Sequence, residues 1–305
     1  NGRNGVSNRA LRPNGVGDVF LISNSGKGES TQLTFGLDKP LIDTWGWSLY
    51  YTYTEATDAS PMTSSTNSSN WGSNLIGDLN SGIAYDSRYA IKDRFTGSVT
   101  WRHNFFADYE TRVGLFYEGR SGRPFSYIFR NDANGDSGGF NDLFYVPNGP
   151  GDVVFTGGAA MEASFFEWLE ANPDLARYAG QIAPANAFRT EWVNSFDVRI
   201  TQELPGFAEG HKSVLALDIM NIGNLLNEDW GLIEDYGFNS TQQLANYAGI
   251  CGPTTTLASC AGNEGRYVYH WTGPGTGAQI QENNNDKGNT AVSRWSVMLS
   301  FKYQF

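Results

Sequence analysis

The chain has 305 residues, a net charge of −11 and 40% hydrophobic residues, with a mean hydropathy of −0.40. No run of about 18 apolar residues occurs, so a transmembrane helix is excluded. The acidic balance argues against nucleic acid as a partner, because a protein that neutralises phosphates needs a basic surface. Aromatic residues make up 14% of the chain and glycines number 36, which suits strands joined by flexible loops.

Apolar and polar residues alternate along seven segments. In the last one, Ser293–Phe305, apolar residues from Trp295 onward share one parity, while Arg294 and Lys302 lie on the other. Successive side chains of a strand point to opposite faces, so each segment predicts a strand with one apolar and one mostly polar face. The segments are 31–37, 45–54, 94–102, 111–118, 191–204, 214–222 and 293–305. Asp18–Ile22 is a weaker candidate, which brings the expected number to about eight.

The connections between these strands alternate between short and long. Short turns are expected near 38–44, 105–109 and 205–211, and long connections at 55–93, 131–189 and 225–290. Long structureless connections are uncommon in compact soluble domains, whereas outer-membrane barrels combine short periplasmic turns with long extracellular loops. The pattern therefore predicts an all-β fold, an antiparallel transmembrane β-barrel in the bacterial outer membrane. A soluble sheet with one solvated face is the alternative, and a secreted glycan-binding β-sandwich is disfavoured by the alternating loop lengths.

The second long connection predicts two short helices. Ala160–Leu169 mixes apolar and acidic residues at helical spacing, and Asn172 followed by Pro173 is typical of a helix start. Gly180 is a plausible end of the second helix. We expect both helices to pack on their own domain, because amphipathic helices usually bury their apolar face there.

The same connection contains a candidate calcium loop. Asp132, Asn134 and Asp136 are spaced by two, glycines lie between them, and Asp142 follows. Hard oxygen ligands on a flexible loop are what calcium requires. The match to an EF-hand is partial, and the alternative is a cluster of polar Asx turns.

Two cysteines, Cys251 and Cys260, bracket a short segment and are the only ones in the chain. They predict a disulfide within a loop in an oxidising compartment, with two free thiols as the alternative. The histidines (His103, His211 and His270) belong to no catalytic motif. We therefore expect no enzymatic activity.

Aromatic residues are frequent in the long connections. They are Trp71, Tyr145, Trp230, Tyr236, Tyr247, Tyr267, Tyr269 and Trp271. We expect them to pack the loops together, since loop aromatics normally bury most of their area. Stacking on a ligand is the alternative.

Several separated motifs, in order along the chain, resemble TonB-dependent outer-membrane receptors of the Oar-like branch. They are Phe35–Pro40, Asn131–Pro147, Phe165–Leu204, Asp218–Gly231 and Ser300–Phe305. The resemblance implies a barrel of about 22 strands with a plugged lumen. It also implies active uptake of a ligand, powered by the inner-membrane TonB complex.

The sequence shows no plug domain, TonB box or N-terminal sandwich domain of the kind this resemblance implies. It begins Asn1-Gly2-Arg3 without the features of a signal peptide. We expect residues 1–305 to be the C-terminal part of such a barrel, contacting outer-membrane lipid and coupling to TonB through a more N-terminal part. The extracellular ligand is unidentified. The alternative is a complete small barrel that serves as an adhesin or structural anchor.

Overall fold

A computed structural model describes residues 22–77, 81–135, 138–139, 141–253, 257–280 and 293–305. It consists mostly of β-strands in antiparallel sheets, with a few short helices. The all-β prediction is confirmed. Within the described ranges, no helix is long and apolar enough to cross a membrane.

One large sheet organises the molecule. Its long strands, in spatial order, are β1 (Glu29–Lys39), β2 (Trp45–Asp58), β4 (Asp93–Phe106), β5 (Tyr109–Arg120), β11 (Val193–Pro205), β12 (Lys212–Met220) and β18 (Ser296–Gln304), and the short β3 (Tyr85–Asp86) pairs with β2. Each long strand is antiparallel to its neighbours. All seven clearly alternating segments are strands.

The sheet is open in the described part of the chain. Strands β1 and β18 form its two edges and do not pair with each other there. The eighth member is β3 rather than the weak candidate at the start. Of that candidate, Ile22 lies outside any strand and the preceding residues lie outside the described ranges.

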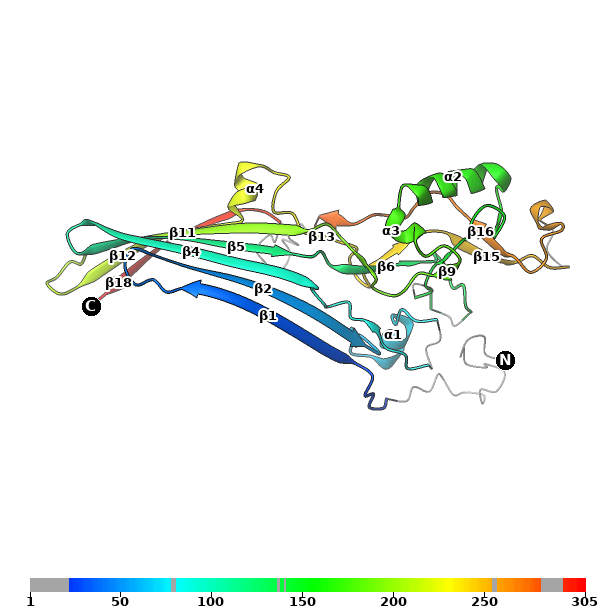
Figure 1. Cartoon of the computed structure of the whole chain (residues 1–305), viewed down its shortest axis with the longest axis horizontal. Helices are drawn as coiled ribbons and strands as arrows, with labels where there is room; N and C mark the ends of the chain where they lie inside the picture. Colours follow the sequence, from blue (N-terminus) through cyan, green and yellow to red (C-terminus); the bar gives the residue numbers. More distant parts are fainter. Residues whose placement is uncertain (1–21, 78–80, 136–137, 140, 254–256, 281–292) are drawn as a thin grey trace.

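Short and long connections lie at opposite ends of the sheet, as the alternation predicted. The turns between β1 and β2, β4 and β5, and β11 and β12 share one end, which we call the turn end (left in Figure 1). The long connections leave from the opposite end, which we call the loop end. There the chain leaves β5 for the second long connection and returns from it into β11.

A second structural unit forms beyond the loop end, from described residues of 121–192 and 234–280; we call it the loop body (Figure 1). Its strands are β6 (Pro124–Ile128), β7 (Tyr145–Val146), β8 (Val154–Phe155), β9 (Gln181–Ile182), β10 (Phe188–Arg189), β13 (Glu234–Asp235), β14 (Thr241–Gln243), β15 (Asn246–Ile250), β16 (Tyr267–His270) and β17 (Gln279–Ile280). They form small sheets, in which β14 with β6 and β16 with β8 are parallel.

The predicted helices are present in the loop body. Helix α2 (Gly158–Glu170) buries Phe165 and Leu169, and α3 (Pro173–Ala176) buries Leu175. These residues belong to one aromatic-rich core with Phe144 and Tyr269. Both helices therefore pack on their own unit, as expected. Helix α3 ends before Gly180, and the Asn172 side chain donates to the Trp168 carbonyl rather than capping α3.

Two other helices lie near the loop end. Helix α1 (Asn67–Gly72) belongs to the first long connection, and α4 (Ile222–Leu226) directly follows β12. The Asn221 amide N–H, at a positive φ of 50°, donates to the Asp197 carboxylate on β11 at 2.8 Å. That bond fixes the start of α4 beside the sheet.

Candidate functional site

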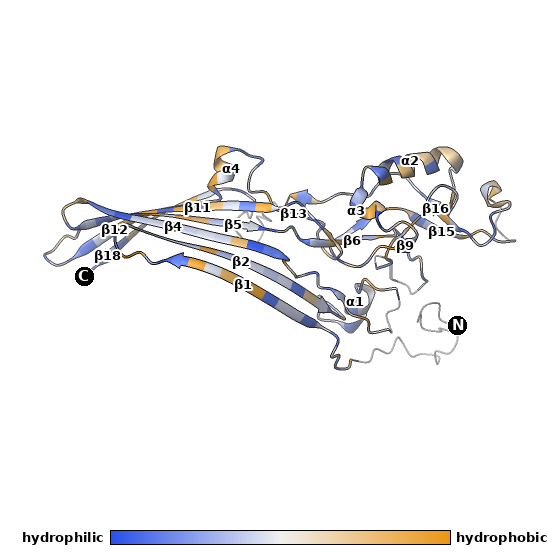
Figure 2. Ribbon diagram, viewed as in Figure 1, coloured by the Kyte–Doolittle hydropathy of each residue, from blue (hydrophilic) through white to orange (hydrophobic). Residues whose placement is uncertain are grey.

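One face of the large sheet is apolar and exposed. Cα partners align its side chains in rows across the strands, because paired residues of an antiparallel sheet point to the same side. One row contains Trp45, Trp101, Val113, Ile200, Leu217 and Leu299. Val99 is 46% exposed and Leu299 68% exposed. Hydrophobic residues recur along these strands in Figure 2. This row crosses six strands, and an apolar surface of that width far exceeds what soluble monomers normally expose.

Aromatic residues mark both ends of this apolar face. Near the loop end the Tyr51 and Phe95 ring centroids are 4.7 Å apart, and Phe95 lies 6.2 Å from Trp192. Near the turn end Trp101 lies 5.8 Å from Phe105. Phe105 lies ten positions after Phe95 on β4, which is roughly 33 Å of strand. At the usual tilt of about 40° this length spans about 25 Å, the height of the apolar band of a membrane barrel.

The opposite face of the sheet is polar, and several of its charges are paired. Arg94 contacts Glu118 at 2.6 Å, and Arg199 contacts Asp218 at 3.0 Å. The hydroxyls of Ser48 and Ser98 lie 2.7 Å apart between neighbouring strands. Exposed ion pairs add little stability. What matters here is their location, because over the middle of the sheet charged side chains lie on this face and not on the apolar one.

A tyrosine-lined pocket of about 580 Å³ opens in the loop body. Tyr145 on β7, Tyr247 on β15, and Tyr267 and Tyr269 on β16 line it, together with Asp142. Tyr267 meets Tyr145 and Tyr247 nearly at right angles, at 72° and 74°, with ring centroids 5.9 Å apart in both pairs. This volume is within the usual range for ligand pockets. The pocket was not predictable from local sequence patterns, because its strands are far apart in the chain.

The hydroxyls of two pocket tyrosines have protein partners. Tyr145 donates to the Asp152 carboxylate at 2.9 Å, and Tyr269 donates to the Tyr145 carbonyl at 3.0 Å. Desolvation, followed by the hydrogen bond to Asp152, raises the pKa of Tyr145 to about 12. Burial also raises the pKa of Tyr269 well above its ordinary value. Both phenols therefore remain neutral at physiological pH.

The residues proposed for calcium lie close to this pocket. Asp132 accepts a hydrogen bond from the Gly135 amide at 2.6 Å, and Asp142 accepts one from the Ala133 amide at 2.8 Å. Asn134 lines the pocket with Asp142, whereas Asp136 lies outside the described residues. The bond from Gly135 to Asp132 is a local turn bond of the kind that was the alternative, whereas the bond from Ala133 to Asp142 joins residues nine apart. In the described ranges no three His, Cys, Asp or Glu side chains cluster as a metal site would need, and calcium stays a prediction.

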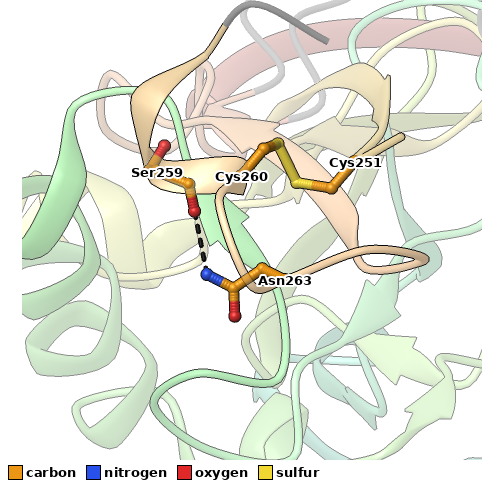
Figure 3. The surroundings of a disulfide bond; sticks show 4 residues. All are labelled: Cys251, Ser259, Cys260 and Asn263. Atoms are coloured by element: carbon orange, nitrogen blue, oxygen red, sulfur yellow. Dashed lines mark hydrogen bonds between the residues drawn. A yellow bond between two sulfur atoms is a disulfide. The ribbon is translucent and has the colours of Figure 1, made fainter. Parts of the chain in front are cut away.

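Cys251 and Cys260 form the predicted disulfide, with Cα atoms 5.2 Å apart (Figure 3). The bridge is buried with Val154 and Val268 in a small cluster beside the main core of the loop body. Asn263 donates to the Ser259 carbonyl at 2.8 Å next to it (Figure 3). The disulfide thus fixes the segment between β15 and β16, the two strands that carry three of the pocket tyrosines.

The aromatic residues of the long connections mostly pack, as expected. Tyr269 is fully buried, Trp271 is nearly so, and Tyr236 packs against the same core. Trp230 is an exception at 56% exposed, and Tyr267 is 44% exposed at the pocket. The prediction that loop aromatics pack together was therefore right for the core of the loop body. It did not identify the aromatic side chains that remain accessible.

Comparison with family models, curated proteins and solved structures gives no match for this chain.

Proposed function

We propose that the large sheet is part of the wall of an outer-membrane β-barrel, and that the chain is the C-terminal part of a TonB-dependent receptor that takes up an unidentified ligand. The observation that carries the proposal is the apolar face of the sheet, bounded at both ends by aromatic residues and backed by a polar face. In this arrangement the apolar face contacts lipid, and the paired charges face a wet lumen.

The open edges of the sheet support a larger barrel. Strands β1 and β18 each have one long neighbour in the described residues, and exposed strand edges are unfavourable in a membrane, where backbone groups must be paired. Additional strands would complete those hydrogen bonds. An eight-stranded barrel would instead require the described edges to pair with each other, with the lumen filled by side chains.

The position of the loop body supports a receptor role. All three long connections leave the same end of the sheet, and two of them fold into a unit with its own aromatic core and pocket. In a membrane barrel that end is extracellular. The resemblance of the sequence to Oar-like receptors adds energised uptake, with the TonB complex contacting a more N-terminal part of the protein.

The intact mass of the natural protein, extracted from outer membranes with detergent, tests the proposal. A mass far above 33.5 kDa supports a plugged receptor of which this chain is one part. A mass near that value favours a small adhesin or anchor over TonB-dependent uptake. Recovery in the soluble fraction would contradict both membrane functions.

A further inference from the structure

We propose that the tyrosine-lined pocket of the loop body binds an organic ammonium group. The geometry is that of an aromatic box, because Tyr145 and Tyr247 each stand nearly perpendicular to Tyr267. Phe129 and Tyr269 are buried in the core beneath the box, where Phe129 stands at 63° to Tyr247 and 80° to Tyr269. Adjacent aromatic walls of this kind suit quaternary and alkylated ammonium groups, which are attracted to the ring faces.

The electrostatics of the pocket favour a cation over an anion. Its described lining contains the carboxylate of Asp142 and no Lys, Arg or His. Asp142 is only 5% exposed and remains hydrogen-bonded to the Ala133 amide, so its position is fixed. An ammonium held by the tyrosines would lie near the negative charge of Asp142. The carboxylate would not have to move, so no free energy would be spent on reorganising it.

A second carboxylate, that of Asp152, is hydrogen-bonded to one of the tyrosines of the box. Asp152 accepts hydrogen bonds from the Tyr145 hydroxyl and from the Asn148 amide, each at 2.9 Å. A phenol that donates to a carboxylate has a more electron-rich ring, and this strengthens the attraction of its face for a cation. The phenol stays protonated, because the pKa of Tyr145 is raised.

The charge distribution of the whole chain points the same way. Residues 121–192 carry nine acidic and four basic side chains, and residues 234–280 carry three and one. The loop body sequence therefore has a net charge of −7 out of −11 for the chain, whereas the middle of the sheet is dominated by paired charges. Such an asymmetry raises the local concentration of cations near the pocket.

The pocket is larger than a single ammonium group needs. Its volume of about 580 Å³ leaves space for the body to which the cation is attached. Both a small quaternary amine and a lysine side chain of a peptide carry the required chemistry. The residues argued to bind the cation all belong to the loop body. That such a cation is the ligand of a receptor rests on the proposed function.

Titration calorimetry on the chain in detergent micelles tests the inference with three probes. Choline is compared with 3,3-dimethyl-1-butanol, its neutral isostere, and with the methylamide of Nα-acetyl-lysine. We expect choline or the lysine derivative to bind at least about tenfold more tightly than the neutral isostere. A preference for choline indicates a small quaternary amine, and a preference for the lysine derivative indicates a peptide. Equal or undetectable binding of all three overturns the inference.

Three variants distinguish attraction of the cation to the ring faces from a general disruption of the loop body. Tyr267→Leu removes one wall and should lower the preference for the cation over the isostere by about tenfold, whereas Tyr267→Phe keeps the ring face and should retain the preference. Trp230→Leu changes an exposed aromatic outside the pocket and serves as the control. Loss of the preference in the phenylalanine variant would contradict recognition by ring faces.

Failure of this inference and failure of the proposed function give different results. If the cation does not bind but the chain inserts into lipid vesicles, the membrane function stands and the pocket has another role. If the cation binds but the complete natural protein does not associate with lipid, the pocket is assigned and the barrel wall is wrong.

Discussion

Replacing Val99 with arginine tests the orientation of the sheet most directly. Val99 lies on the apolar face of β4, between the aromatic residues Phe95 and Phe105, and is paired with Trp47 and Leu115. Its position four residues from Phe95 and six from Phe105 places it near the middle of the apolar band. In a barrel wall, Val99→Arg moves a guanidinium into the hydrocarbon core.

The expected destabilisation is large. An arginine on the lipid face near the bilayer midplane costs about 2–4 kcal/mol. At about 1.36 kcal/mol per decade, this corresponds to a roughly 30- to 900-fold change in the unfolding equilibrium constant. The measurement is reversible denaturant unfolding of the complete natural protein in lipid vesicles, followed by tryptophan fluorescence.

Thr100→Arg is the matched control. Thr100 is the next residue of β4 and faces the polar side, where its partner on β5 is Gly114. A Cβ added at Gly114 would lie 3.9 Å from the Arg199 carbonyl oxygen, its nearest neighbour on another strand, so the larger side chain has room there. We expect a change of less than about 1 kcal/mol, since lumen-facing charges are solvated. If Val99→Arg were as mild as the control, the apolar face would not contact lipid.

Three further predictions concern the loop body. Replacing Cys251 and Cys260 with serine should destabilise it by about 2.5 kcal/mol, from the entropy of closing a loop of about ten residues, and limited proteolysis should detect faster cleavage there. Calorimetry with calcium chloride should show binding that Asp136→Ala weakens; no heat from the unmodified chain would contradict the calcium hypothesis. The raised pKa of Tyr145 means that its stabilising contribution is present below pH 10 and is lost as the pH rises through about 12. A difference titration by ultraviolet absorbance between the unmodified chain and Tyr145→Phe should therefore show ionisation near pH 12 rather than pH 10.

The strands were predictable because their signal is local. Alternation along β18, for example, places Leu299 and Phe301 on the apolar side and Ser300 and Lys302 on the other, and nothing beyond the segment is needed to see it. The same holds for the helix around Phe165. Boundaries were less certain, since β2 continues to Asp58, past the point where its apolar alternation ends.

The long connections could not be predicted in the same way. Their small strands are only a few residues long, and β6 pairs with β10 and β14, which come from different connections. Such pairings depend on contacts between distant segments rather than on local periodicity. The burial of Tyr269 and the exposure of Tyr267, two residues apart on the same strand, illustrate that composition alone does not separate core aromatics from accessible ones.

The disulfide combines a feature that is readable from local sequence with an effect on contacts between distant segments. It could be predicted from the spacing of the cysteines, but its consequence for the pocket could not. By closing the segment between β15 and β16, it limits the ways in which Tyr247 and Tyr267 can separate. A box of aromatic rings binds a cation well only when its walls are held in place before the ligand arrives. Reduction of Cys251 and Cys260 should therefore weaken binding of an organic ammonium even where the sheet remains inserted in lipid, and unchanged affinity after complete reduction would show that the core of the loop body alone holds the tyrosines in position.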